Sequence, residues 1–205
     1  MFIMRAAILD YDAGNVFNLM SALEYIGIDP FLTNDERRLD DSGVIFIPGV
    51  GAFGDASQNL KKYDLFDVIR RQHKKGKWIV GICLGMQILF DKGFEDGEND
   101  GLGLLKGQVK PILTDYKLPH MGWNELIIKS RENPISDIDM GSYLYFIHSY
   151  CAYPENASNV IASCSYGMDI PAIVKGEGVL GLQFHPEKSG RTGLKILKNI
   201  KEMLK

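Results

Sequence analysis

The stretch at residues 78–87 restricts the possible folds of this chain more than any other segment. It reads WIVGICLGMQ, an apolar run that leads into Gly81, Cys83 and Gly85 and then into residues that favour a helix. A buried strand that turns sharply into a helix has this pattern. We expect glycine at positions 81 and 85 because a side chain there would collide with the neighbouring backbone. Cys83 would then occupy a strained turn at the end of a sheet, where the N-terminus of the following helix favours the nucleophilic thiolate.

A second motif, near the end of the chain, provides a base for that thiol. His185 follows an apolar strand predicted at residues 179–184, Pro186 ends this strand, and Glu187 lies two positions after the histidine. The carboxylate can hold one imidazole nitrogen while the other takes the thiol proton. A lone cysteine beside a tight turn, or a lone histidine after a strand, is more often structural. Found together, these residues predict a catalytic triad of Cys83, His185 and Glu187.

Residues 81–87 (GICLGMQ) and 185–187 (HPE) resemble the two signature motifs of the class I, triad-type glutamine amidotransferases. More narrowly, residues 48–53 (PGVGAF), 119–124 (PHMGWN) and 185–189 (HPEKS) resemble the glutaminase subunits of imidazole glycerol phosphate synthases. The resemblance extends over essentially the whole chain. It implies an enzyme that uses the triad to hydrolyse the side-chain amide of glutamine to glutamate and ammonia.

The loop after the apolar strand at Val44–Ile47 offers groups that stabilise an oxyanion. Gly49 and Gly51 flank Val50, so the peptide units there can turn over without Cβ clashes and present a backbone N–H. An ordinary strand-end turn is the alternative interpretation. We favour the oxyanion role because this loop follows a central strand and should open on the same sheet edge as Cys83. The N–H of Leu84, directly after the cysteine, would complete the oxyanion site.

The resemblance also implies which residues bind glutamine. Ser149 and Tyr150 match a segment that contacts the α-amino and α-carboxylate groups, and Gln87 matches a further binding position. Without the resemblance, Gln87 is equally a residue that bonds the local backbone. His148 competes with His185 for the role of base, but no carboxylate follows it closely. We therefore expect His148 to be structural or to line the substrate site.

A partner subunit is implied as well. In the resembling family, ammonia passes to a cyclase (synthase) subunit in a heterodimer, which forms imidazole glycerol phosphate and aminoimidazole carboxamide ribotide in histidine biosynthesis. Pro119, Met121 and Trp123 would face this partner, and Asn15 and Lys188 would lie on the same face. From the residues alone, an exposed tryptophan and methionine suit a partner surface, since aromatic residues act as interface anchors. A core tryptophan packed under a loop is the alternative.

The order of elements predicts an α/β fold in one domain over residues 1–205. We expect a mostly parallel central sheet flanked by helices, with additional antiparallel strands in the second half; the resemblance implies a flavodoxin-like arrangement. The predicted helices are at residues 16–26, 63–75 and 190–204, and a helix follows the turn at Cys83 within residues 77–92. The predicted strands outside those motifs are at residues 5–10, 30–33, 44–47, 108–113, 125–129, 143–149, 160–165, 172–175 and 179–184.

Composition excludes several other classes of protein. The net charge of −3 without a basic tract argues against nucleic-acid binding, and no apolar run reaches membrane-spanning length. The N-terminus lacks the features of a signal peptide. Cysteines at 83, 151 and 164 fit free thiols in a reducing compartment, so we expect a cytoplasmic protein in which Cys151 and Cys164 are inert. No ligand spacing indicates a metal, and a thiolate with an imidazole needs no cofactor.

The first loop, at residues 10–15, departs from the resembling family at one position. The family has Asp-Tyr-Gly at the start of this loop, and here Asp12 takes the place of the glycine. Open α/β sheets place binding groups in such a loop, although Asp, Gly and Asn also simply favour a turn. The sequence leaves the shape of this loop open.

Three other functions also remain open at the level of sequence. A paralogous glutaminase would supply ammonia to a sugar-modifying synthase in surface-polysaccharide assembly, and the acceptor site of either enzyme lies on the partner. A cysteine peptidase of related fold would act on γ-glutamyl peptides. A non-catalytic regulatory module of the same fold is opposed by the complete set of triad residues.

Overall fold

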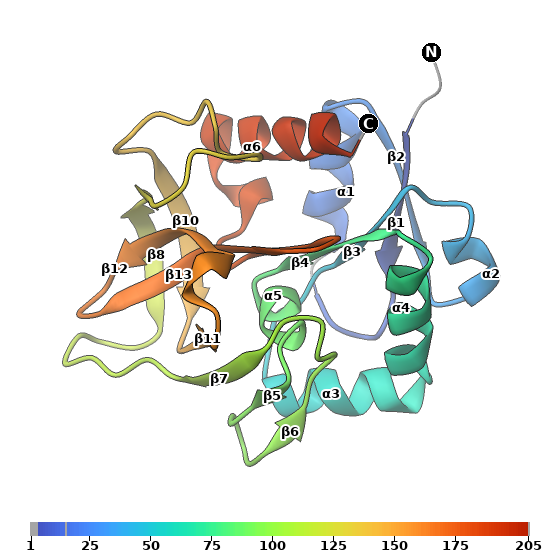
Figure 1. Ribbon diagram of the computed structural model, residues 1–205, viewed down its shortest axis with the longest axis horizontal. Coiled ribbons are helices and arrows are strands. Elements are labelled where there is room, and N and C mark those ends of the chain that lie inside the picture. Colours follow the sequence, from blue (N-terminus) through green and yellow to red (C-terminus); the bar gives the residue numbers. More distant parts are fainter. Residues whose placement is uncertain (1–3, 15, 205) are drawn as a thin grey trace.

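The computed structural model describes residues 4–14 and 16–204, and its centre is an eight-stranded sheet (Figure 1). The first five strands in spatial order are parallel, and the other three extend one edge of the sheet in antiparallel fashion. The predicted α/β class with added antiparallel strands is confirmed. In spatial order the strands are β2 (Ile28–Thr33), β1 (Met4–Leu9), β3 (Val44–Ile47), β4 (Trp78–Ile82), β14 (Val179–Leu182), β13 (Asp169–Gly176), β12 (Val160–Ser165) and β9 (Ile127–Ile128).

Helices cover both faces of the parallel part of the sheet. They are α1 (Val16–Tyr25), α2 (Glu36–Leu39), α3 (Phe53–Lys62), α4 (Leu65–Lys74), α5 (Leu84–Ile88) and α6 (Gly190–Met203), with 3₁₀ turns at Ala157–Asn159 and Pro186–Lys188. No helix among the described residues is both long and apolar enough to span a membrane.

Alternate residues of the central strands enter two separate apolar cores. In β1, Ala6 and Ile8 pack with α1 and α6, and Ala7 and Leu9 pack with α3, α4 and α5 (Figure 1). Because helices cover both faces, a central strand such as β3 is buried at every position. This explains the unbroken apolar runs in the sequence.

The sequence predicts neither α2 nor α3, and the helix that it predicts at residues 63–75 begins two residues before α4. In α3, Gly54 and Ser57 have low intrinsic helix propensity. The helix is stabilised instead by burial of Phe53, Ala56 and Leu60, which recur at helical spacing against the sheet. That spacing was the available signal for α3, and tertiary packing outweighs its weak local propensity.

Two smaller sheets lie beside the main one in the second half of the chain. One pairs β10 (Tyr143–His148) with β8 (His120–Glu125); the other contains β11 (Tyr150–Pro154), β7 (Gly107–Pro111), β5 (Lys92–Gly93) and β6 (Asn99–Asp100). The strand predicted at residues 125–129 is wrong in its bounds, since β8 ends at residue 125 and β9 is separate. The buried position of β8 holds His120, and its exposed positions hold Met121 and Trp123. This inverts the usual apolar alternation, so the sequence pattern does not predict this strand.

Candidate active site

The turn between β4 and α5 holds Cys83 in the strained conformation that the sequence predicts. Cys83 has φ 55° and ψ −112°, a combination that residues other than glycine rarely adopt. A Cβ at position 81 would collide with the carbonyl oxygen of Gly85, and a Cβ at position 85 would collide with the carbonyl oxygen of Ile47. Glycine is therefore required at both positions by close approach of the backbone. The cysteine is almost fully buried, yet it lines a cleft.

Adjacent strands bring the two distant motifs together. β4 and β14 are parallel neighbours, and the Cys83 N–H donates to the Leu182 carbonyl at 2.7 Å. The segment after β14 therefore runs beside the turn that carries the cysteine. The His185 N–H donates to the Tyr145 carbonyl at 2.9 Å, and the Ser189 hydroxyl donates to the His185 carbonyl at 2.6 Å. These bonds fix the backbone of His185 against β10.

His185 and Glu187 form a buried pair behind the cysteine. His185 Nδ1 lies 2.8 Å from Glu187 Oε1, and both side chains are about 5% exposed or less. Because a carboxylate accepts hydrogen bonds, Nδ1 carries the proton and Nε2 is left for proton transfer. Burial alone would lower the pKa of His185, but interactions with Cys83 and Glu187 outweigh it and raise that pKa to about 9. Within the described residues Nε2 lacks a hydrogen-bond partner, so it is available for proton transfer.

The loop after β3 lies directly on the turn that carries Cys83. A Cβ at Gly49 would come within 2.8 Å of both the Leu84 Cβ and the Tyr11 hydroxyl oxygen. The Tyr11 hydroxyl is buried and donates to the Pro48 carbonyl at 2.6 Å. This contact holds the start of the loop, while Val50 remains 45% exposed at its tip. The two loops thus open on the same edge of the sheet, as the strand order predicts.

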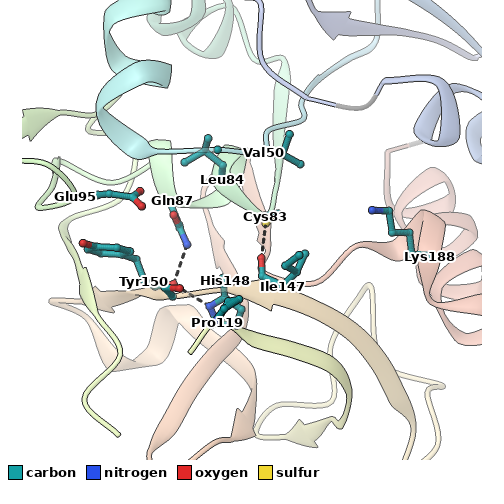
Figure 2. Close-up of a pocket in the computed structure, with 12 residues that line it drawn as sticks. Val50, Cys83, Leu84, Gln87, Glu95, Pro119, Ile147, His148, Tyr150 and Lys188 are labelled. Carbon is teal, nitrogen blue, oxygen red and sulfur yellow. Dashed lines mark hydrogen bonds between the residues drawn. The ribbon is translucent and has the colours of Figure 1, made fainter. Parts of the chain in front are cut away.

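One cleft of about 260 Å³ joins most of the predicted site residues (Figure 2). It brings together the predicted oxyanion residues Val50, Gly51 and Leu84 with the nucleophile. In Figure 2, Gln87 and Tyr150 lie on one side of the sulfur and Lys188 on the other. His185, Glu187 and Gly49 line a small separate hollow instead, and Val50 lines both spaces. The cleft is lined by Val50, Gly51, Cys83, Leu84, Gln87, Glu95, Pro119, Ile147, His148, Ser149, Tyr150 and Lys188.

Residues 7–203 match the family model for class-I glutamine amidotransferases. The chain belongs to this family. It is 43% identical over 199 residues to imidazole glycerol phosphate synthase subunit HisH of Aquifex aeolicus, covering 97% of this chain and 96% of the relative. It is 44% identical over 198 residues to the subunit of that name from Caldanaerobacter subterraneus, covering 97% and 98%. Among solved structures, PurLQS from Thermotoga maritima has a TM-score of 0.80 at 25% identity and complete mutual coverage.

Glu95 also lines the cleft of this amidotransferase, and it is not among the site residues that the sequence predicts. It belongs to the acidic segment between β5 and β6, where the sequence resembles an ordinary surface loop. Its Oε2 accepts the N–H of Phe53, the first residue of α3, at 2.7 Å. Partial burial raises the pKa of this carboxyl group above its usual value. Nothing in the local sequence marks Glu95, because only the docking of the β5–β6 hairpin brings it beside Gln87.

His148 is not placed to act as the base. Its Nδ1 donates to the Tyr150 carbonyl at 2.8 Å, and its Nε2 lies 3.0 Å from His120 Nδ1. Burial lowers the pKa of His148 to about 4, so the ring is neutral near pH 7. The expected structural and lining role agrees with this geometry.

The outer face of β8 carries the residues predicted to meet a partner. Met121 and Trp123 are more than half exposed, so the alternative of a core tryptophan is wrong. The Trp123 ring meets the Tyr145 ring edge-on, and Lys188 Nζ lies 6.0 Å from the centre of the same Tyr145 ring. Pro119 lines the cleft itself. Asn15, the other predicted interface residue, lies outside the described residues.

The first loop adopts a glycine-like conformation in spite of its aspartate. Asp12 has φ 60°, and its carboxylate accepts bonds from the Tyr63 hydroxyl at 2.5 Å and Lys62 Nζ at 3.1 Å. These bonds hold the loop against the end of α3. A Cβ at Gly14 would lie 3.4 Å from the Gly49 backbone nitrogen, so this loop also packs on the predicted oxyanion loop.

The other titratable groups that the structure describes do not form a metal centre. Among the described residues, no cluster of three or more histidine, cysteine or acidic side chains is arranged to bind a metal ion. Cys151 and Cys164 are free and buried, and burial raises the pKa of these thiols to about 11 and about 12. Both thiols are therefore protonated near neutral pH.

Proposed function

We propose that this chain is the glutaminase subunit of an imidazole glycerol phosphate synthase. It would hydrolyse glutamine and pass the ammonia to a cyclase subunit in a heterodimer that serves histidine biosynthesis. The observation that carries the proposal is the arrangement of Cys83 at a strained turn, beside the buried His185–Glu187 pair and at the edge of a cleft. Identity of 42–44% to HisH subunits over nearly the whole chain supports this choice of acceptor pathway.

The proposed reaction uses only groups of this chain and water. The Cys83 thiolate attacks the amide carbon of glutamine, and His185 Nε2 protonates the departing ammonia to leave a γ-glutamyl thioester. His185 then takes a proton from water, which attacks the thioester and releases glutamate. Glu187 holds the Nδ1 proton and stabilises the imidazolium without transferring a proton itself. No cofactor or metal enters any step.

The oxyanion of each tetrahedral intermediate would be held by backbone N–H groups. Leu84 begins α5, and intrahelical hydrogen bonds in this turn start only at the Met86 N–H. The Leu84 N–H is therefore free of the helix ladder and adjacent to the sulfur. The loop with Gly49, Val50 and Gly51 supplies a second donor when its peptide turns an N–H toward the cysteine. Each such donor is typically worth about 2.7–4 kcal/mol in the transition state.

Glutamine would lie in the cleft with its α-amino and α-carboxylate groups away from the sulfur. Ser149 and Tyr150 are proposed to contact these groups, with Gln87 between them and the nucleophile. Glu95 adds a carboxylate at the same end, which suits the positive α-ammonium group. The length of glutamine then directs the side-chain amide toward Cys83.

The cyclase partner is proposed to bind the face that contains Pro119, Met121, Trp123 and Lys188. Asn15, in the first loop, is proposed to belong to the same interface. Free hydrolysis would waste glutamine, so we propose that the isolated chain is nearly inactive. The glycine-flanked peptide between residues 49 and 50 is the proposed gate, since a carbonyl facing the sulfur repels the oxyanion and an N–H stabilises it. A ligand-loaded partner would favour the active orientation.

The domain organisation and the cellular location are also part of the proposal. We treat residues 1–205 as one amidotransferase domain, since the main sheet takes strands from both halves of the chain. The three cysteines are free in the structure, which fits the proposed cytoplasmic location, where thiols stay reduced.

The experiment that tests the function is Cys83→Ser in the reconstituted complex with the cyclase. Glutamine-dependent synthesis should be abolished because a serine hydroxyl is a far weaker nucleophile in a site built for a thiolate. Synthesis from free ammonia should survive, since the partner uses ammonia directly. Loss of both activities would contradict the proposed division of labour. A chain that binds a sugar-modifying synthase instead of the cyclase would contradict the proposed acceptor.

A further inference from the structure

A buried glutamine, Gln183, lies directly beside the proposed nucleophile and has no role in the reaction described so far. It follows β14, its side chain is fully buried, and its backbone N–H donates to the Ala172 carbonyl at 2.9 Å. Gln183 Nε2 lies 3.9 Å from Cys83 Sγ, and Gln183 Oε1 lies 3.1 Å from Gln87 Nε2. Within the described residues the sulfur is the only hydrogen-bond partner of this Nε2. A buried amide N–H is costly to leave unpaired, so its direction toward the sulfur matters.

The orientation of the Gln183 amide follows from its neighbours. The two ends of an amide group look alike in outline, so the end that donates must be decided by the hydrogen-bond partners. The carbonyl of Tyr150 can only accept, and therefore Gln87 presents its Nε2 to it, at 2.9 Å. The second hydrogen of the same Nε2 points to Gln183, which must accept it with Oε1. The donor end of Gln183 is thereby left facing Cys83.

The Tyr150 carbonyl is itself fixed by a second set of neutral side chains. Because this carbonyl only accepts, His148 Nδ1 is protonated and His148 Nε2 is an acceptor, which receives the Nδ1 proton of His120 at 3.0 Å. His120 Nε2 in turn accepts from Asn124 Nδ2 at 3.1 Å. Every link has one donor and one acceptor, with both imidazoles neutral. A single chain of hydrogen bonds thus extends from β8 to the sulfur.

We propose that Gln183 is a further residue of the catalytic site, whose side-chain N–H stabilises the Cys83 thiolate and directs the sulfur into the cleft. This inference rests on the proposed function, because it concerns the same nucleophile. Another polar neighbour of the sulfur is the Ile147 carbonyl at 3.7 Å, which suits a thiol that donates but repels a thiolate. An amide donor opposes that repulsion without adding a charge to the site. The N–S distance is long in the resting structure, and such contacts shorten when charge develops on the sulfur.

The test measures thiolate reactivity directly, by the rate of alkylation of the full chain with iodoacetamide between pH 6 and pH 9. We expect Gln183→Met, which keeps the volume but removes the donor, to lower the rate at pH 7 about tenfold. Gln183→Glu, which replaces the donor by a carboxylate, should lower it further. Cys83→Ser measures the background, which should be small because Cys151 and Cys164 are fully buried and have raised pKa values.

Gln72→Met is the matched control, since Gln72 is another fully buried glutamine, in α4, whose Nε2 donates to Asp40. It should lose stability without changing the alkylation rate of Cys83. An unchanged rate in both Gln183 variants, or an equal fall in the Gln72 variant, would overturn the inference. If Gln183→Met does not fold by circular dichroism, the Gln183→Glu variant decides.

This experiment is separable from the test of the proposed function because it requires neither glutamine nor a partner. A complex that does not use glutamine, combined with the expected alkylation rates, would reject the function and retain the role of Gln183. A complex that uses glutamine, combined with unchanged alkylation rates, would reject the role of Gln183 and retain the function.

Discussion

His185 and His148 lie in two segments that flank Cys83, and their pKa values are shifted in opposite directions. Both rings are buried, and burial alone would make both neutral. His185 has the Glu187 carboxylate at 2.8 Å and the cysteine nearby, which raise its pKa to about 9. His148 has no carboxylate beside it, so burial and the nearby charge of His185 lower its pKa to about 4, and the hydrogen bond to the Tyr150 carbonyl opposes this only in part.

The difference teaches that the partner of a buried histidine, rather than its burial, decides whether it can act as an acid. A carboxylate two residues after His185 keeps a proton available near neutral pH for the departing ammonia. The segment after His148 contains no such group, and its ring organises hydrogen bonds instead. One segment therefore transfers protons, and the other positions side chains.

The largest expected effect comes from removing the acid–base group. His185→Ala should lower glutamine hydrolysis by the complex about 10³-fold or more, because both proton transfers lose their agent. His148→Gln is the matched change in the other segment, and its amide can still donate to the Tyr150 carbonyl. This variant should lower glutamine hydrolysis about tenfold or less. Steady-state kinetics of both variants in the complex will decide, and equal losses would contradict the division between the two histidines.

Glu187→Gln should have the next largest effect, about 10²-fold on hydrolysis, because the glutamine can orient the ring but does not stabilise its charge. The high-pH limb of the rate profile reports the loss of the imidazolium. In the unmodified chain activity should fall as pH rises through about 9. Removing the carboxylate removes one cause of the raised pKa, so this limb should move to lower pH. A limb that stays at the same pH would show that Glu187 does not control His185.

The two histidines should also affect stability at opposite ends of the pH range. His148 binds its proton only near pH 4 when folded but near its ordinary 6.5 when unfolded, so its contribution falls as pH drops from about 6.5 to about 4. His185 has a raised pKa, so its contribution is complete below about 6.5 and disappears as pH rises through about 9.

In thermal melts, the unmodified chain should therefore lose more stability than His148→Gln between pH 7.5 and pH 4.5. The difference should be about 2 kcal/mol, or roughly 4–8 °C in Tm. Parallel melting curves for the two proteins over this range would mean that His148 is not held neutral.

The smallest expected effect on the folded chain concerns the exposed end of the His148 segment, where β8 pairs with β10. Trp123→Ala should reduce affinity for the partner by about 2 kcal/mol while leaving Tm nearly unchanged, since the ring is 55% exposed. Tyr25→Ala removes an even more exposed ring at the end of α1 and should change neither value. Calorimetric titration with the partner measures the affinity. A large fall in Tm at unchanged affinity would assign Trp123 to folding rather than to binding.

Local sequence determined the parts of this protein that depend on neighbouring residues. The glycines at 81 and 85 require a sharp turn at Cys83, and the spacing of His185 and Glu187 allows their pairing whatever surrounds them. Apolar runs identified the parallel strands, because a strand buried on both faces must be apolar throughout. These features arise from backbone sterics and from the period of a strand or helix, both of which act over a few residues.

Only the tertiary structure decided which distant side chains meet at the sulfur. Glu95 reaches the cleft because the β5–β6 hairpin docks there, and Gln183 faces Cys83 because β14 lies beside β4. His148 is neutral because folding buries its ring and places His120, rather than a carboxylate, against it. Each of these results depends on packing between segments that are far apart in sequence. No local pattern encodes such distances, so protonation and orientation at the site were set by the fold as a whole.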